Sequence, residues 1–428
     1  MKHTVSIFRL VFITTTLAVL ALIYSSHEHW YYVIGPLHNM DLGYPFADMQ
    51  ARLGIAEAIN HGIDVNHEHN PFTPSGALNN KPLYTVTIMA LLSLKTSDSL
   101  ILGILFGTIY CLWAFWLLRP TNWIETLISL AIFLSPPSLL LIERSNDDII
   151  IFAFIMAVPL LLETGRLRGR VLGWIVISLL TPMKYYPAAA YALFLHRPKS
   201  LKELLGYTGA SIAFVLGMLW LIRDELTTLT DRIPSPSINY SFGKTLLFEC
   251  FNSLESTNIF FLVGALIIVL LGYLFLIHPK LQVKEAQPRE ELYFLLGSAL
   301  LSFCFLLSGN WDYRLAFVIP TLPLTFLFLN GGERLPKMLA LTYIVSLLLT
   351  LWPEYIYFFN IIEPKEDTWI LNYDHYYIVA VLKHSASWIM IGSNILIACL
   401  ILKSSLFKLM HDGLLIFKRD QETHAKTL

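Results

Sequence analysis

The sequence predicts an all-α, polytopic membrane protein, and three observations support this fold class. Of the 428 residues, 55% are apolar and only 14% are charged, which is too apolar for an ordinary soluble globular chain. The mean hydropathy is +0.59. Apolar runs close to the length of about 20 residues that a membrane crossing needs recur along the whole chain. We therefore expect one domain over residues 1–428, with about 12 membrane helices and no separate soluble domain.

The apolar runs, taken in order, define the expected helices. The first run, 5–25, follows Lys2 and Arg9 and resembles a signal sequence. No small-x-small cleavage pattern follows it, so we expect a retained helix. The other apolar runs lie at 99–118, 123–141, 148–163, 171–182, 186–196, 204–222, 257–277, 292–308, 314–330, 337–352 and 386–403.

Three segments depart from this simple pattern. Residues 47–61 alternate apolar and polar side chains with helical spacing, which predicts a helix lying in the membrane interface. Residues 83–96 are apolar but too short to cross, so we expect a juxtamembrane or re-entrant helix. The runs 171–182 and 186–196 are also short and are separated by prolines, which indicates a broken hairpin that dips into the membrane.

The distribution of basic residues predicts the orientation. If 83–96 does not cross, 19 of the 30 Lys and Arg residues fall on one side, including both termini. If it did cross, the basic segment 166–170 would lie outside, against the positive-inside rule. We therefore expect cytoplasmic termini and outer loops at 26–98, 223–256 and 353–385.

Composition also excludes some classes of ligand. The net charge is −1 and the basic residues are scattered, unlike the concentrated basic face of a nucleic-acid-binding protein. The four cysteines show no disulfide framework and no zinc spacing. His67, Glu68 and His69 do not supply a complete set of metal ligands. We expect no metal and no cofactor.

Two acidic clusters flank the predicted membrane border. Asp48 lies in the first turn of the interfacial helix, where it could serve chemistry or simply stabilise the helix N-terminus. The segment 143–148, Glu-Arg-Ser-Asn-Asp-Asp, could be a solvated turn between two helices. However, Asp148 directly precedes an apolar run, and ionisable groups at that depth are usually functional.

Two cations lie at comparable borders. Lys184, between the two short runs, is a compact charge suited to a phosphate, although it could instead extend to the interface. Arg314 opens an apolar run, and its guanidinium suits bidentate phosphate contacts. It could alternatively pair with Asp312 and stabilise the turn.

Together, these residues form an ordered set of motifs that resembles glycosyltransferase family 87 of the GT-C superfamily. The resemblance is stronger over 1–222 than over the more variable 223–428. Arg52-Leu53 replaces an aromatic pair usual in that family. The matching segments are Asp48 with Ala58 and Gly62, Asn70-Pro71-Phe72, Lys81-Pro82-Leu83-Tyr84, Arg144-Ser145-Asn146-Asp147-Asp148, Lys184-Tyr185-Tyr186-Pro187 and Asp312-Tyr313-Arg314.

The resemblance implies a GT-C bundle with outer-side juxtamembrane helices in the inner (plasma) membrane. Such an enzyme moves a sugar, here mannose or another hexose or pentose, from a polyprenyl-phosphate donor to a lipid or glycan acceptor on the outer face. Transfer would be inverting and metal-independent. Asp48 would be the catalytic base, with Asp147 or Asp148 as alternatives. The implied substrate-binding residues are Lys81, Arg144, Asn146, Asp147, Asp148, Lys184, Tyr185, Asp312 and Arg314.

Two other classes of function remain open from the sequence. Charged residues within membrane segments could line the pathway of a transporter or flippase of lipid-linked sugars. No internal repeat is apparent, whereas many transporters contain one. A non-catalytic membrane scaffold would leave the polar clusters unexplained.

Overall fold

The computed structural model confirms the all-α class. It describes residues 6–26, 28–30, 33, 45–73, 79, 82–225, 241–249, 288–307, 310–352, 363–365, 368–370 and 378–403. Within these ranges, six helices are long and apolar enough to cross a membrane, or seven if one bent pair counts as a single span. The protein is therefore a multi-pass membrane protein.

The N-terminal half is built from helices of very different lengths. Its elements are α1 (Ile7–Ile23), α3 (Ala47–Asn60), α4 (Leu83–Leu91), the 3-10 helix η1 (Thr96–Asp98), α5 (Ser99–Leu117), α6 (Trp123–Phe133), α7 (Pro136–Arg144), α8 (Asp147–Ile155), α9 (Val158–Glu163), α10 (Leu167–Leu180), the 3-10 helix η2 (Tyr186–Leu195) and α11 (Leu201–Leu221).

The C-terminal half adds longer helices and two small strand pairs. Its elements are β1 (Ser241–Phe242), α13 (Leu246–Glu249), α15 (Pro288–Leu307), β2 (Asn310–Trp311), the 3-10 helix η4 (Asp312–Thr321), α16 (Leu322–Asn330), α17 (Arg334–Leu351), β3 (Glu363–Lys365), β4 (Thr368–Ile370) and a last helix, Ile378–Lys403. β1 pairs with β2 and β3 with β4, both antiparallel.

Several predicted spans are broken into shorter helices. The expected run 123–141 becomes α6 and α7, which meet at an angle of 46° at Ser135, directly before two prolines. The expected run 148–163 becomes α8 and α9, with Pro159 in the first turn of α9. These breaks reduce the number of long helices relative to the 12 expected, and the run 257–277 lies outside the described residues.

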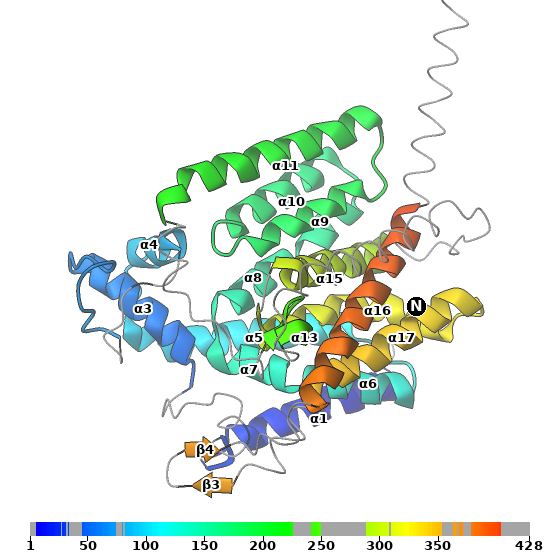
Figure 1. Ribbon diagram of the computed structural model, residues 1–428, viewed down its shortest axis with the longest axis horizontal. Helices are drawn as coiled ribbons and strands as arrows, with labels where there is room; N and C mark the ends of the chain where they lie inside the picture. The colour runs from blue at the N-terminus through cyan, green and yellow to red at the C-terminus, as the bar shows by residue number, and fades with distance from the viewer. Residues whose placement is uncertain are drawn as a thin grey trace, which may run out of the picture.

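Several long helices lie roughly along one axis of the molecule. In Figure 1, α1, α11 and α15 run along its length, the last helix crosses them steeply, and α3 and α4 lie together at one end. We call this the Asp48 end. At the centre, α15 packs against η2 and η4, and its buried face includes Phe294 and Phe305.

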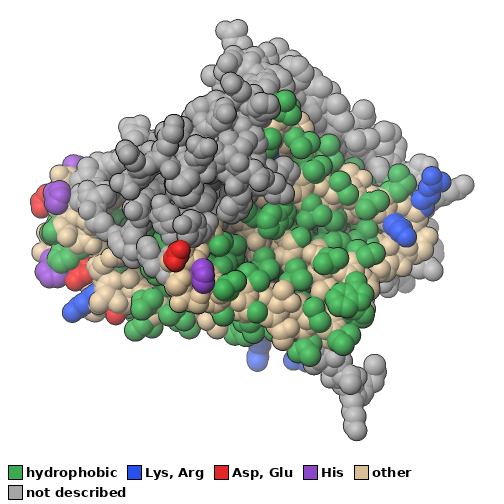
Figure 2. Space-filling model, turned by 90° about the horizontal axis from the view of Figure 1, so that it is seen from below, with side chains coloured by type: hydrophobic (Ala, Val, Ile, Leu, Met, Phe, Trp, Pro, Cys, Tyr) green, Lys and Arg blue, Asp and Glu red, His purple; other side chains and the backbone are tan. Residues whose placement is uncertain are grey.

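The outer face of the bundle is apolar, as a surface in contact with lipid requires. Figure 2 shows hydrophobic side chains across one face, with charged side chains mostly near its edges. The large exposed apolar residues include Ile101, Leu112, Leu216 and Trp220. Helix α11 is the most exposed of the candidate spans, since only 11% of its apolar window is buried.

Both short segments that were expected at the membrane interface form helices. The expected amphipathic helix 47–61 is α3, and the expected non-crossing segment 83–96 contains α4, which is only nine residues long. Glu57 of α3 accepts hydrogen bonds from the backbone and the side chain of Thr96, at 3.0 and 2.6 Å. These bonds attach α3 to the start of α5 at the Asp48 end.

Candidate functional site

Phe46 fixes the start of α3 and hence the position of Asp48. Its backbone has a φ of 65°, in the left-handed region, and its N–H donates to the carbonyl of Glu143 at 2.9 Å. Its ring lies against Gly103 of α5, where an added Cβ would come within 2.3 Å of the ring. The absence of a side chain at Gly103 therefore allows α3 to sit directly on α5.

Asp48 faces the turn between α7 and α8. Its Oδ2 accepts from Nδ2 of Asn146 at 3.4 Å and lies 3.7 Å from Nη1 of Arg144. The N-cap position of α3 is occupied by Phe46, so Asp48 is not the capping residue. The contacts with Asn146 and Arg144 bring together two segments that the sequence analysis singled out separately.

The turn itself is shaped by two residues. Ser145 ends α7 in a left-handed conformation, with φ 44° and ψ 47°, a region that glycine adopts more readily. Asn146 then caps α8, its Oδ1 accepting from the backbone N–H of Asp148 at 2.8 Å. The amide of Asn146 thus holds the α8 terminus with one atom and Asp48 with the other.

Arg52 is a member of the site that the sequence analysis missed. It forms an ion pair with Asp147, and both side chains are essentially inaccessible to solvent. Burial lowers the pKa of Arg52, but the charges of Asp147 and Asp48 outweigh that effect and raise it. The spacing of four residues from Asp48 on one helix was the available signal, because such residues share a face.

Asp148 holds three groups from distant segments. It forms an ion pair with Lys184, accepts from the hydroxyl of Tyr186 at 2.6 Å and lies 3.8 Å from Nε of Arg314. Lys184 lies in the turn between α10 and η2, and Tyr186 is the first residue of η2. The predicted broken hairpin therefore has its tip in this cluster.

Asp312 forms an ion pair with Lys383 at 2.6 Å, and both side chains are buried. The expected alternative, in which Arg314 pairs with Asp312, is not the arrangement seen, because Arg314 faces Asp148. Lys383 was missed because the last helix was predicted to begin at residue 386, whereas it begins at Ile378. A lysine beside a histidine within an otherwise apolar helix was the signal that could have revealed it.

Aromatic rings lie against the three partly exposed cations, and Arg314 lies over the ring of Tyr186 at 5.3 Å. Arg144 lies over the ring of Trp311 at 4.9 Å, and Lys184 lies over the ring of Tyr313 at 5.6 Å. The rings of Trp311 and Tyr313 are nearly parallel, at 8°. Cations over such rings gain a favourable electrostatic contact, which holds them in place without neutralising them.

Exposure separates the four aspartates into two kinds. The side chains of Asp147, Asp148 and Asp312 are at most 1% exposed, whereas that of Asp48 is 26% exposed. The cations nearest to solvent are Arg144, Lys184 and Arg314, at 12 to 17%. Asp48 is thus the accessible carboxylate of the cluster, and these three are its accessible cations.

Tyr185, which was expected to bind substrate, is not part of this cluster. Tyr185 lies next to Lys184 in sequence but near Glu225, and within the described residues its hydroxyl has no hydrogen-bond partner. Lys81 lies outside the described residues. In the described part of the chain, no three His, Cys, Asp or Glu side chains are arranged to hold a metal ion.

An apolar groove lies beside Tyr185. It has a volume of about 420 Å³ and is formed by α4, α11 and the turn at Pro182. Its polar lining residue, Glu225, accepts from the backbone N–H of Leu83 at 2.6 Å and so joins the end of α11 to the start of α4. Its lining residue Pro182 lies two residues before Lys184 in the chain.

Comparison with known proteins gives little further guidance. No protein-family model matches the chain, and no curated protein sequence matches it. The crystal structure of ArnT from Cupriavidus metallidurans in the apo state is similar over 92% of this chain and 77% of that chain, with 11% identity and a TM-score of 0.33. A similarity this low does not establish the family of the chain.

Proposed function

We propose that the protein is a membrane glycosyltransferase of the GT-C kind that uses a polyprenyl-phosphate sugar as donor. The observation that carries the proposal is the division among the four aspartates: Asp48 is partly exposed, at 26%, whereas the other three are buried in close ion pairs. Such a site offers one carboxylate to a substrate and surrounds it with fixed positive charge.

The charge of the cluster suits a phosphodiester donor. Among the described residues, the four aspartates of the cluster are in contact with five cations: Arg52, Arg144, Lys184, Arg314 and Lys383. A polyprenyl-phosphate sugar carries one negative charge, and the phosphate monoester released from it carries nearly two at pH 7. Cations fixed beside the leaving phosphate stabilise the charge that develops on it.

Asp48 is assigned as the general base. The acceptor hydroxyl transfers its proton to the Asp48 carboxylate while its oxygen attacks the anomeric carbon, and the bond to the phosphate oxygen breaks. A single displacement of this kind inverts the anomeric carbon. General-base assistance contributes about 10² to 10⁴ in rate. The buried pairing of Asp147 and Asp148 favours Asp48 over either of them in this role.

The apolar groove supplies a place for the lipid part of the donor. Its wall is almost wholly apolar, and it opens beside the turn that carries Lys184. A prenyl chain in this groove would leave its phosphate near Lys184 and Arg314. The ring of Trp311, which is partly exposed and lies under Arg144, offers a flat surface for the sugar or the acceptor.

A binding and transfer assay tests this proposal. In proteoliposomes containing a labelled polyprenyl-phosphate hexose, we expect sugar transfer to a lipid or glycan acceptor with release of polyprenyl phosphate. Lys184→Gln should weaken donor binding about ten-fold or more, because a hydrogen bond to a charged group is lost. Lys95→Gln, which changes an exposed lysine near the same end, should leave binding unchanged.

Two outcomes would contradict the proposal. Equal donor affinity in the Lys184→Gln and Lys95→Gln proteins would remove the phosphate role from Lys184. Movement of intact labelled donor between leaflets, without cleavage of its sugar, would instead assign the chain to transporters of lipid-linked sugars.

A further inference from the structure

A polar pocket lies at the opposite end of the helices that carry the Asp48 cluster. Three elements link the two places. Helix α5 begins next to η1 and reaches the pocket at Leu117. Helix α15 begins in the pocket and ends near β2. η4 and α16 together run from Asp312 to Asn330, which lines the pocket. The 19 residues of α5 extend about 28 Å, close to the thickness of a bilayer core.

The pocket contains two guanidinium groups arranged around one indole ring. The guanidinium carbons of Arg119 and Arg289 lie 5.4 and 5.6 Å from the centre of the Trp116 ring. Each arginine uses its Nε for a contact within the protein: Arg119 donates to the carbonyl of Trp116, and Arg289 donates to Glu163, both at 2.9 Å. Within the described residues, the terminal nitrogens of both arginines make no hydrogen bond, so they are available to an anion.

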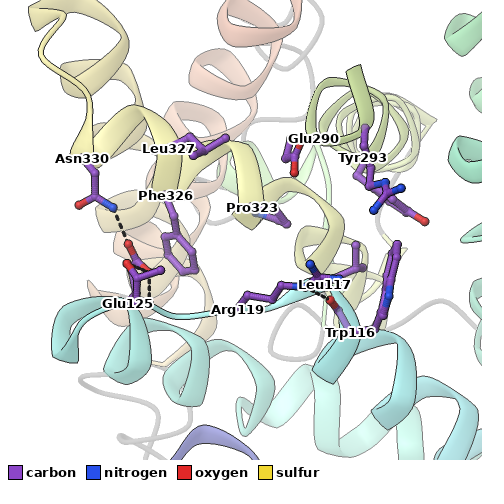
Figure 3. Close-up of a pocket in the computed structure, with 12 residues that line it drawn as sticks. Trp116, Leu117, Arg119, Glu125, Glu290, Tyr293, Pro323, Phe326, Leu327 and Asn330 are labelled. Atoms are coloured by element: carbon purple, nitrogen blue, oxygen red, sulfur yellow. Dashed lines mark hydrogen bonds between the residues drawn. The ribbon is translucent and has the colours of Figure 1, made fainter. Parts of the chain in front are cut away.

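The two carboxylates that line the pocket differ in the number of hydrogen bonds that their oxygens accept. Glu125 accepts from Thr121, Asn122 and Asn330, so both of its oxygens are occupied. Glu290 has a buried Oε2 with no hydrogen-bond partner in the described part of the chain. In Figure 3, Glu290 and Arg119 lie on different sides of the pocket, whereas Glu125 is bonded to Asn330.

A buried, unpaired carboxylate oxygen is costly unless a donor or a cation reaches it. A simple anion would accept hydrogen bonds from the two arginines, but the charge of Glu290 would repel it. A zwitterion can bind the arginines through its phosphate and Glu290 through its primary ammonium. The pocket volume of about 220 Å³ exceeds by far the space needed for a single water molecule.

We propose that this pocket binds a phosphate ester bearing a primary ammonium, with the phosphate on Arg119 and Arg289 and the ammonium on Glu290. A membrane lipid is one source of this chemistry, because Leu327, which also lines the pocket, is 48% exposed on the apolar surface of the bundle. The site lies at the end of the molecule away from Asp48 and does not depend on the function proposed above.

The proposal is tested by native mass spectrometry of the full-length protein titrated with short-chain lipids. Dioctanoyl phosphatidylethanolamine should bind more tightly than its N-acetyl derivative, which keeps the phosphate but lacks the ammonium. Glu290→Gln should lower the affinity for phosphatidylethanolamine about ten-fold and abolish this preference, because a charged hydrogen bond is removed. Arg119→Gln should weaken binding of both lipids.

Control variants distinguish lipid binding in the pocket from nonspecific attraction of lipids to surface charge. Glu333→Gln and Arg168→Gln change residues outside the pocket and should leave both affinities unchanged. Competition by free phosphoethanolamine at matched concentration would identify a soluble ester as the ligand, and its failure to compete would identify a lipid. Equal binding of the two lipids by the unmodified protein, or an unchanged preference in the Glu290→Gln protein, would overturn the proposal.

Discussion

At the scale of single residues, the Asp48 cluster is organised by buried ion pairs that fix most of its charges. Arg52 and Asp147 are inaccessible to solvent, as are Asp312 and Lys383. A buried pair contributes little net stability relative to apolar residues, but loss of one partner leaves an uncompensated charge. These pairs therefore position the site more than they stabilise the fold.

The Arg52 and Asp147 pair gives a direct test at this scale. Arg52→Met should destabilise the protein by about 3–5 kcal/mol, because Asp147 is left charged and buried. Adding Asp147→Asn to that variant should recover a large part of the loss, since the unpaired charge is removed. The measurement is the unfolding midpoint in a denaturing-detergent titration. Additive destabilisation by the two changes would show that the pair is not coupled.

At the scale of elements, the site depends on how closely α3 sits on α5. The contact is made by the ring of Phe46 over Gly103, and the α3 helix then presents Asp48 to the turn at Asn146. Glu57 holds the other end of α3 to Thr96, and these two hydrogen bonds lower the pKa of its carboxyl group. Thr96 lies just before the predicted span 99–118, whereas Gly103 lies within it.

Gly103→Ala should impair activity without removing any polar group. The added methyl would meet the Phe46 ring at 2.3 Å, so α3 must move, and overpacking of this kind typically costs about 1–3 kcal/mol. Gly107→Ala is a matched control on the same helix, because its Cβ would lie 3.5 Å from Ile142, an ordinary contact. Sugar transfer and thermal stability should fall in the first protein only. Equal behaviour of the two variants would contradict the role of this contact.

The elements show what the sequence could and could not predict. The period of apolar residues predicted α3, and the short apolar length after Pro82 predicted that α4 would not cross. The breaks at Ser135 and after Ile155 were not predicted, because the apolar runs continue through them. Apolar composition reports burial in lipid, whereas bending depends on prolines and on packing against neighbouring helices.

For the candidate site too, the sequence predicted the residues but not their packing. Arg144, Asn146, Asp148, Lys184 and Arg314 were predicted from their places at membrane borders, and the structure brings them together. Their pairings depend on distances between segments far apart in sequence, so the choice of Asp148, not Asp312, as the partner of Arg314 could not be predicted. Arg52 was missed although it lies four residues after Asp48 on one helix, and Lys383 was missed because the last helix was predicted to begin at residue 386.

At the scale of the whole molecule, the Asp48 cluster and the polar pocket at Arg119 lie at opposite ends of an apolar bundle, and this arrangement requires a defined orientation in the membrane. The excess of basic residues predicts that the Asp48 end faces outward and the Arg119 end faces the cytoplasm. This orientation would place the donor phosphate in the outer leaflet and the zwitterion pocket in the inner one.

Cysteine labelling tests the orientation. In a background without the four native cysteines, His67→Cys should react with a membrane-impermeant thiol reagent in intact cells, because the His67 side chain is 74% exposed at the Asp48 end. Arg168→Cys, at the exposed start of α10, should react only after the membrane is opened. The reverse pattern would invert the predicted orientation.

The central claim is that Asp48 is the base of a sugar transfer from a polyprenyl-phosphate donor. The most direct test is a single-turnover measurement on Asp48→Asn, with Asp64→Asn as a control in an exposed aspartate of the same segment. We predict that Asp48→Asn lowers the transfer rate by about 10² to 10⁴ while donor affinity stays unchanged. A transfer rate equal to that of the unmodified protein would contradict the assignment.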